Sequence, residues 1–251
     1  MQFDEAKWVI NSQEEFSLIR ERADGWVAKH TRSADISRRH VEEVFVYWDT
    51  TTGSLFHSDV SLVTRIVEHR SPNFRWEIGT LGAAGKQPAR TRVWSLKQYP
   101  EMPLVGDVSS EDDMLTALAF QAKAARPSDL DAKLAPYQVS SQDVRPVLRL
   151  KIVRDISDIP LLFPDSNSST WQLEYTSVRA RDVRVETKSS GEAIWHEIEL
   201  SRNDKQPLDR FTEYSSSFEK EVQLTPYRMR IGQFTKYQRA ATLLQLQWSS
   251  E

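Results

Sequence analysis

Charged side chains recur at every second position in several stretches of this sequence. Arg149 and Lys151 alternate with leucine and isoleucine, and so do Glu197 and Glu199. Because successive side chains of a β-strand point to opposite faces, each stretch predicts a strand with one apolar and one charged face. In an antiparallel sheet such a charged face commonly meets water. In a closed barrel the same faces would line the interior and bring carboxylates and basic groups together, as a site for a metal ion and a phosphate chain requires.

Strand-forming stretches dominate the chain. Eight of them are rich in β-branched and aromatic residues. They are 41–48, 61–68, 74–80, 89–96, 144–153, 170–176, 178–187 and 194–200. Turn residues between them, such as Thr52-Gly53, favour antiparallel hairpins. Segment 126–141 is rich in Pro, Ser and Asp, as linkers are, but strands on both sides belong to one predicted sheet, so we expect a single domain over 1–251.

Helix signals are few. Ser12 begins a capping box and predicts a helix that ends near Lys29. An acidic first turn predicts a second helix over 110–125. A third candidate, 226–246, has weaker periodicity and fits a helix or a strand.

Composition narrows the function classes. The chain has 251 residues, and its net charge of -3 gives no general attraction to nucleic acid. The absence of cysteine excludes disulfides, thiolate metal sites and cysteine nucleophiles. No basic and apolar leader and no apolar run of membrane-spanning length occurs, so we expect an intracellular, cytoplasmic protein without a membrane partner.

Several familiar catalytic patterns are missing or unfavourable. The Gly- and Ala-rich segment 82–87 lacks the glycine spacing and the hydroxyl residue of a phosphate-binding loop. No G-x-S-x-G elbow occurs. His196 stands beside the acidic pair, but strand alternation directs it to the opposite face. We expect Trp8, Trp26 and Trp48 to belong to the core, together with Trp76.

Short motifs follow one another in a characteristic order. They are Val46-Tyr47-Trp48-Asp49-Thr50 with Gly53-Ser54-Leu55, Val60-Ser61-Leu62-Val63-Thr64-Arg65 with Trp76-Glu77-Ile78, the proline-led basic strand from Arg145 to Arg154, His196-Glu197-Ile198-Glu199-Leu200, and Thr235-Lys236-Tyr237-Gln238-Arg239. This ordered set covers nearly the whole chain. It resembles the CYTH family, the triphosphate tunnel metalloenzymes that include thiamine triphosphatases, class IV adenylate cyclases and inorganic triphosphatases.

The resemblance implies an α+β, β-rich fold: a closed antiparallel eight-stranded β-barrel, or tunnel, with a few flanking helices. The family's E-x-E-x-K motif falls on Phe3-Asp4-Glu5-Ala6-Lys7. Carboxylates would hold Mg or Mn, and the matching positions are Glu5, Glu174, Glu197 and Glu199. Basic side chains would bind the substrate's phosphates, and the matching positions are Lys7, Arg65, Arg92, Arg149, Lys151, Arg154 and Lys236. Of these residues, the resemblance assigns catalytic roles to Glu5, Lys7, Arg65 and Lys236.

Four positions depart from the family pattern. Phe3, Val63, Gly79 and Thr176 stand where charged side chains are expected. A shifted strand register would explain them, because a slip of one residue exchanges the two faces. Loss of some of the side chains that bind the metal ion and the triphosphate would also explain them. A third explanation is a specialised pocket, in which Phe3, Val63 and Trp94 form an apolar wall for an organic ligand with one or two phosphates.

These observations lead to one expected function and two alternatives. The first is a divalent-metal-dependent phosphohydrolase that acts on an organic triphosphate or diphosphate inside the tunnel. The second is a catalytically degenerate module that binds a phosphorylated ligand or an acidic partner. The third is a cyclase or lyase that expels pyrophosphate. A small phosphorylated molecule is the expected partner, and neither its identity nor the oligomeric state follows from the sequence.

Overall fold

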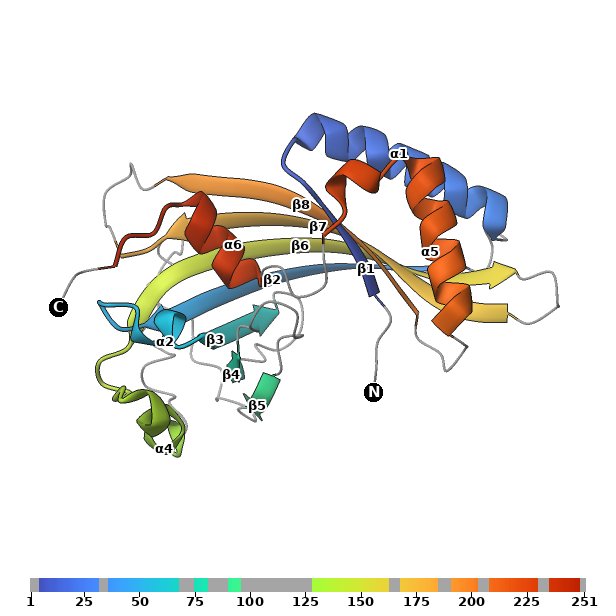
Figure 1. The fold of residues 1–251 in the computed structure, drawn as a ribbon. Helices are drawn as coiled ribbons and strands as arrows, with labels where there is room; N and C mark the ends of the chain where they lie inside the picture. Colours follow the sequence, from blue (N-terminus) through green and yellow to red (C-terminus); the bar gives the residue numbers. More distant parts are fainter. Residues whose placement is uncertain are drawn as a thin grey trace, which may run out of the picture. The chain divides into compact units, whose positions relative to one another are not determined.

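Eight strands form the framework of the described part of the protein (Figure 1), for which we use a computed structural model. The structure describes residues 5–31, 36–67, 75–80, 90–95, 128–162, 168–184, 191–202, 208–229 and 235–248. The strands are β1 (Glu5–Ile10), β2 (Ser37–Asp49), β3 (Val60–Val67), β4 (Arg75–Thr80), β5 (Arg90–Ser95), β6 (Arg145–Leu162), β7 (Ser168–Asp182) and β8 (Glu192–Arg202). The helices are α1 (Gln13–His30), α2 (Ser54–His57), α4 (Leu130–Leu134), η2 (Ala135–Tyr137), α5 (Leu208–Val222), η3 (Thr225–Tyr227) and α6 (Lys236–Leu243).

The strands form one sheet in the order β1-β8-β7-β6-β2-β3-β4-β5. Pairing is antiparallel between β1 and β8 and along the series β2, β3, β4 and β5. The predicted α+β, β-rich class is therefore confirmed. Closure into a barrel is not confirmed, because β1 and β5 stand at the two ends of the strand order of the described residues.

Most of the predicted strands are present, with two differences. The stretches predicted as 170–176 and 178–187 form the single strand β7. Strand β1 was not among the eight predicted stretches. Its alternation is nevertheless regular, since Ala6, Trp8 and Ile10 are buried while the residues between them are half-buried.

The helix predictions had mixed outcomes. Helix α1 begins where predicted, and the Ser12 hydroxyl accepts a hydrogen bond from the backbone N–H of Glu15. The helix predicted over 110–125 lies outside the described residues. The candidate at 226–246 is not one element, since it contains the end of η3 and, separately, α6. Helix α5 was missed, and segment 126–141 contains α4 and η2.

Residue contacts divide the chain into two compact units. Unit 1 comprises residues 1–42, 152–179 and 194–230, and unit 2 comprises 43–151, 180–193 and 231–251. Strands β2, β6, β7 and β8 contribute residues to both units, so the single domain over 1–251 stays a prediction.

The core of unit 1 lies between its strands and two helices. Figure 1 shows α1 and α5 side by side, and the two helices are in contact. Trp26 of α1 packs edge to face on Phe218 of α5, and Trp8 of β1 packs on the same phenyl ring. Burial of such large aromatic side chains supplies much of the stabilisation of a core. Since Trp8 faces the helices, its neighbours along β1 face the other side of the sheet.

The end of β2 is fixed by a buried carboxylate in unit 2. Asp49 accepts hydrogen bonds from the backbone N–H groups of Thr50, Leu55 and Phe56, and from the hydroxyl of Tyr237 at 3.2 Å. Burial raises the pKa of Asp49, while these hydrogen bonds oppose the rise. The motif around Asp49 and the closing segment around Tyr237 therefore have a structural role, since they join the turn to α6.

No helix in the described part of the chain has both the length and the apolar character needed to cross a membrane.

Candidate functional site

Three carboxylates surround one ammonium group on the face of unit 1 that points away from α1 and α5. The Nζ atom of Lys7 lies 2.9 Å from Glu199, 3.2 Å from Glu5 and 3.7 Å from Glu197. Strand pairing places Lys7 opposite Glu199 on the adjacent strand, and alternation puts Glu5 and Glu197 on the same face. The structure thus brings together four of the residues that the resemblance selects.

The electrostatics of this Lys7 cluster follow from burial and charge. Burial favours the uncharged form of Lys7, but the charges of Glu197, Glu199 and Glu5 outweigh it and raise the pKa of the ammonium well above its usual range. Burial also raises the pKa of Glu5, with a further rise from Glu199 and an opposing effect of Lys7. With all four groups ionised the cluster has a net charge of −2.

A tryptophan that the sequence analysis did not select completes the surroundings of Glu197. The indole N–H of Trp195 donates a hydrogen bond of 2.9 Å to Oε1 of Glu197, while Oε2 faces Lys7. The two residues are two positions apart on β8, so they share a face. The same alternation that selected Glu197 and Glu199 could have pointed to Trp195.

Glu174 belongs to a second group on the strands of unit 1. It lies 3.5 Å from Nε of Arg154 and accepts a hydrogen bond of 2.6 Å from the hydroxyl of Thr176. Thr176, which stands at a position where an acid was expected, therefore serves as a hydrogen-bond donor to the neighbouring acid. The contacts of Glu174 place it with Arg154 and not in the Lys7 cluster.

The other predicted phosphate-binding residues belong to unit 2. Arg65 forms an ion pair with the buried carboxylate of Glu43, to which its Nε donates at 2.8 Å. Arg149 is buried and Lys151 is half-buried, so the face that these two share does not simply meet bulk water. Lys236 is the first residue of α6. Sequence reasoning missed Glu43, which lies diagonally across from Arg65 on the paired strands.

The predicted apolar wall is described only in part. Val63 is buried on β3, in register with Tyr47. Phe3 lies outside the described residues. Arg92 and Trp94 lie on β5, but their side chains are outside the described part. Gly79 lies on β4 opposite Ser61.

His196 faces the helices, as its strand parity predicts. Its ring stacks on Phe16 of α1 with centroids 4.4 Å apart, and Nδ1 lies 2.9 Å from the Ser177 hydroxyl. Burial lowers the pKa of His196. The residue is therefore part of the packing and not of the Lys7 cluster.

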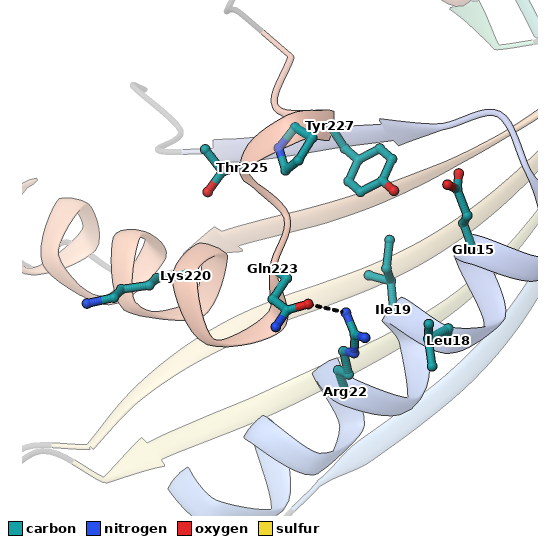
Figure 2. A pocket seen from close by; sticks show the side chains of 9 residues that line it. Glu15, Leu18, Ile19, Arg22, Lys220, Gln223, Thr225 and Tyr227 are labelled. Atoms are coloured by element: carbon teal, nitrogen blue, oxygen red, sulfur yellow. Dashed lines mark hydrogen bonds between the residues drawn. The ribbon is translucent and has the colours of Figure 1, made fainter.

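A shallow cavity of about 450 Å³ lies on the helical side of unit 1 (Figure 2). Its lining includes Leu18, Ile19 and Arg22 of α1 and Tyr227 of η3. Arg22 donates a 2.7 Å hydrogen bond to Gln223 across it. None of the predicted site residues lines this cavity, so it is separate from the Lys7 cluster.

The donor set of the Lys7 cluster suits a hard cation. Carboxylate oxygens are the ligands that Mg²⁺ takes in proteins, and a divalent ion in the place of the ammonium would neutralise two of the three carboxylate charges. In the described residues no three carboxylate or imidazole groups are already arranged as metal ligands, and the ammonium of Lys7 lies among the three carboxylates. The chemistry and charge of the donors fit a metal ion, provided that the ammonium yields its place.

Comparison with solved structures identifies the fold. An adenylyl cyclase-type protein from Hippeastrum, reported with a dominant triphosphatase activity, superposes with a TM-score of 0.55 at 11% identity, covering 96% of each chain. The chain has the CYTH-type fold. A protein from Bacillus halodurans described as an adenylate cyclase gives a TM-score of 0.49 at 14% identity, covering 94% of this chain and 95% of its own. No family profile and no curated protein sequence matches.

Proposed function

We propose that this CYTH-fold chain is a divalent-metal-dependent phosphohydrolase that acts on an organic triphosphate or diphosphate in a closed β-tunnel. The observation that carries the proposal is the convergence of Glu5, Glu197 and Glu199 on a single cationic position at Lys7. The triphosphatase activity of the Hippeastrum protein with the same fold supports this reaction class.

Each group of the Lys7 cluster has a defined task in such a reaction. Glu5, Glu197 and Glu199 would hold Mg or Mn, which supplies charge neutralisation and a positioned water. Lys7, displaced from the carboxylates, would donate its N–H groups to a phosphate oxygen. Placing cationic donors around the reacting phosphate is the main contribution of a protein to phosphoryl transfer.

The remaining basic residues would bind the rest of the phosphate chain. They are Arg65, Arg92, Arg149, Lys151, Arg154 and Lys236. Arginine suits this role because its planar guanidinium binds two oxygens at once. Val63, with Phe3 and Trp94, would face the organic part of the substrate.

Phosphate release by the purified chain tests the proposal. The substrates are ATP, thiamine triphosphate, tripolyphosphate and a prenyl diphosphate, each with Mg²⁺ or Mn²⁺. We expect turnover of at least one of them, and a loss on the order of 100-fold in Glu197→Gln because a metal ligand is removed. Glu213→Gln, at an exposed position of α5, is the matched control and should retain activity. Absence of turnover with every substrate and both metals would refute the proposal.

A second candidate is a binding module for a phosphorylated ligand. It is favoured by the ion pairs of the cationic side chains, since Lys7, Arg65 and Arg154 each contact a carboxylate in the structure. Calorimetry with tripolyphosphate in the presence of EDTA distinguishes the two functions. Binding without metal and without turnover supports the module, whereas metal-dependent turnover excludes it.

A further inference from the structure

Trp195 is placed to control one carboxylate of the proposed metal site. Its side chain is fully buried, and its indole N–H donates to Oε1 of Glu197 at 2.9 Å. Glu197 itself is only 4% exposed. One oxygen of this buried carboxylate is thus committed to the indole, and the other, Oε2, is directed at the position of Lys7.

The hydrogen bond is not a general feature of the buried tryptophans. The indole N–H groups of Trp8 and Trp26 are also buried, and neither has a hydrogen-bond partner in the described part of the chain. Packing of a large aromatic ring in this protein therefore does not require a carboxylate beside it. Because Trp195 has no exposed surface, it cannot stack on a substrate, and its indole N–H reaches the Lys7 cluster through Glu197.

A second carboxylate also accepts from a neutral donor on its own strand, although the same Oε1 of Glu174 lies 3.5 Å from Nε of Arg154. The Thr176 hydroxyl donates to Glu174 from two positions along β7, as Trp195 does to Glu197 from two positions along β8. In both cases a neutral donor fixes one oxygen of a buried acid on the same face of the strand. A neutral donor fixes the direction of a carboxylate without cancelling its charge, whereas an arginine or lysine would compete with a bound cation.

We propose that Trp195 is a positioning residue of the metal site: its indole N–H holds Oε1 of Glu197, so that Oε2 alone is presented to the cation. The inference rests on the proposed function, since it assigns the role of Trp195 through the carboxylate cluster. Residues that orient a metal ligand typically contribute 10–100-fold to metal affinity.

Binding of Mn²⁺ to the full chain, measured by calorimetry, tests the role without relying on turnover. Trp195→Phe keeps an aromatic ring but removes the N–H, and we expect it to weaken Mn²⁺ binding about 10-fold. Trp26→Phe is the matched control because that indole is equally buried and donates to no group in the described residues; its affinity should equal that of the wild type. In a Glu197→Gln background, Trp195→Phe should cause no further loss, because the two changes act on one interaction.

The outcomes separate the inference from the proposed function. The role of Trp195 would be overturned if Trp195→Phe bound Mn²⁺ as tightly as the wild type. It would also be overturned if Trp195→Phe weakened Mn²⁺ binding equally in the wild-type and the Glu197→Gln background. Either result would leave the metal site in place. Failure of the wild type to bind Mn²⁺ would overturn both. If Trp195→Phe does not fold, a Mg²⁺ titration of the wild type decides: the indole N–H resonance of Trp195 should shift with saturation, and that of Trp26 should not. An unmoved Trp195 resonance at saturating Mg²⁺ would refute the inference.

Discussion

Replacing Lys7 by methionine tests the arrangement of charges at the centre of the site. Methionine keeps a long apolar stem but leaves Glu5, Glu197 and Glu199 without their shared counter-charge. Removing one partner of a fully buried ion pair costs about 3–5 kcal/mol, and an exposed pair contributes less than about 1 kcal/mol. The side chain of Lys7 is 24% exposed, so we expect a cost between those of a fully buried and an exposed ion pair. We therefore expect Lys7→Met to lower the free energy of unfolding by about 2 kcal/mol, or Tm by about 4–8 °C.

Divalent cations should reverse this loss. If the carboxylates bind Mn²⁺, the ion takes the place of the ammonium and its affinity for the variant exceeds its affinity for the wild type. At 100 times its dissociation constant, Mn²⁺ stabilises a folded protein by about 2.7 kcal/mol, enough to offset the substitution. Thermal unfolding with and without Mn²⁺ measures both effects in one experiment.

The control for this experiment is Lys29→Met. Lys29 is exposed in the last turn of α1, where a cation contributes less than about 1 kcal/mol through the helix dipole. That variant should show no gain in Mn²⁺ response. A Lys7→Met protein as stable as the wild type would refute the energetic reasoning, and a destabilised variant that Mn²⁺ fails to stabilise would refute the exchange of ammonium for metal.

Two further predictions concern the packing of His196 in unit 1 and the backbone conformation at Gly53 in unit 2. Burial lowers the pKa of His196 below its ordinary value of 6.5, so the unfolded chain binds a proton at this residue more readily than the folded protein does. The contribution of neutral His196 to the free energy of unfolding should therefore be complete above about pH 6.5 and decline as the pH falls through the folded-state pKa. Denaturant unfolding between pH 5 and 8 should show that the free energy of unfolding falls less steeply with decreasing pH in His196→Gln than in the wild type. An unchanged slope would contradict the assignment of this pH dependence to His196. Gly53→Ala should destabilise by about 1–3 kcal/mol, because Gly53 has a positive φ of 71° and the ring of Trp248 occupies the space of a Cβ. Gly25→Ala, within α1 and with open space beside it, should instead stabilise by about 0.5–1 kcal/mol, so equal effects of the two substitutions in denaturant unfolding would contradict this account.

Alternation along strands was the part of the site that could be predicted from sequence. A period of two is a local property of an extended chain, so it correctly put Glu197 with Glu199 and His196 on the opposite face, where the structure packs it on α1. The order of the motifs predicted the CYTH-type fold, and the comparison with the Hippeastrum protein confirmed it. Helix α1 was also predictable, because a capping box and helical spacing act within one segment.

Contacts between distant segments could not be read in this way. The pairing of β1 with β8 brings Lys7 to Glu199, which lies 192 positions later in the chain, and nothing local to either residue specifies the other. The same holds for the pair of Arg65 and Glu43 and for the hydroxyl of Tyr237 on Asp49. Strand pairing and side-chain packing decide these contacts. The free energy that favours each contact is gained only when segments distant in sequence come together and water is excluded between them. The residue types of the site were therefore set by the sequence itself, and their partners were set by the tertiary structure.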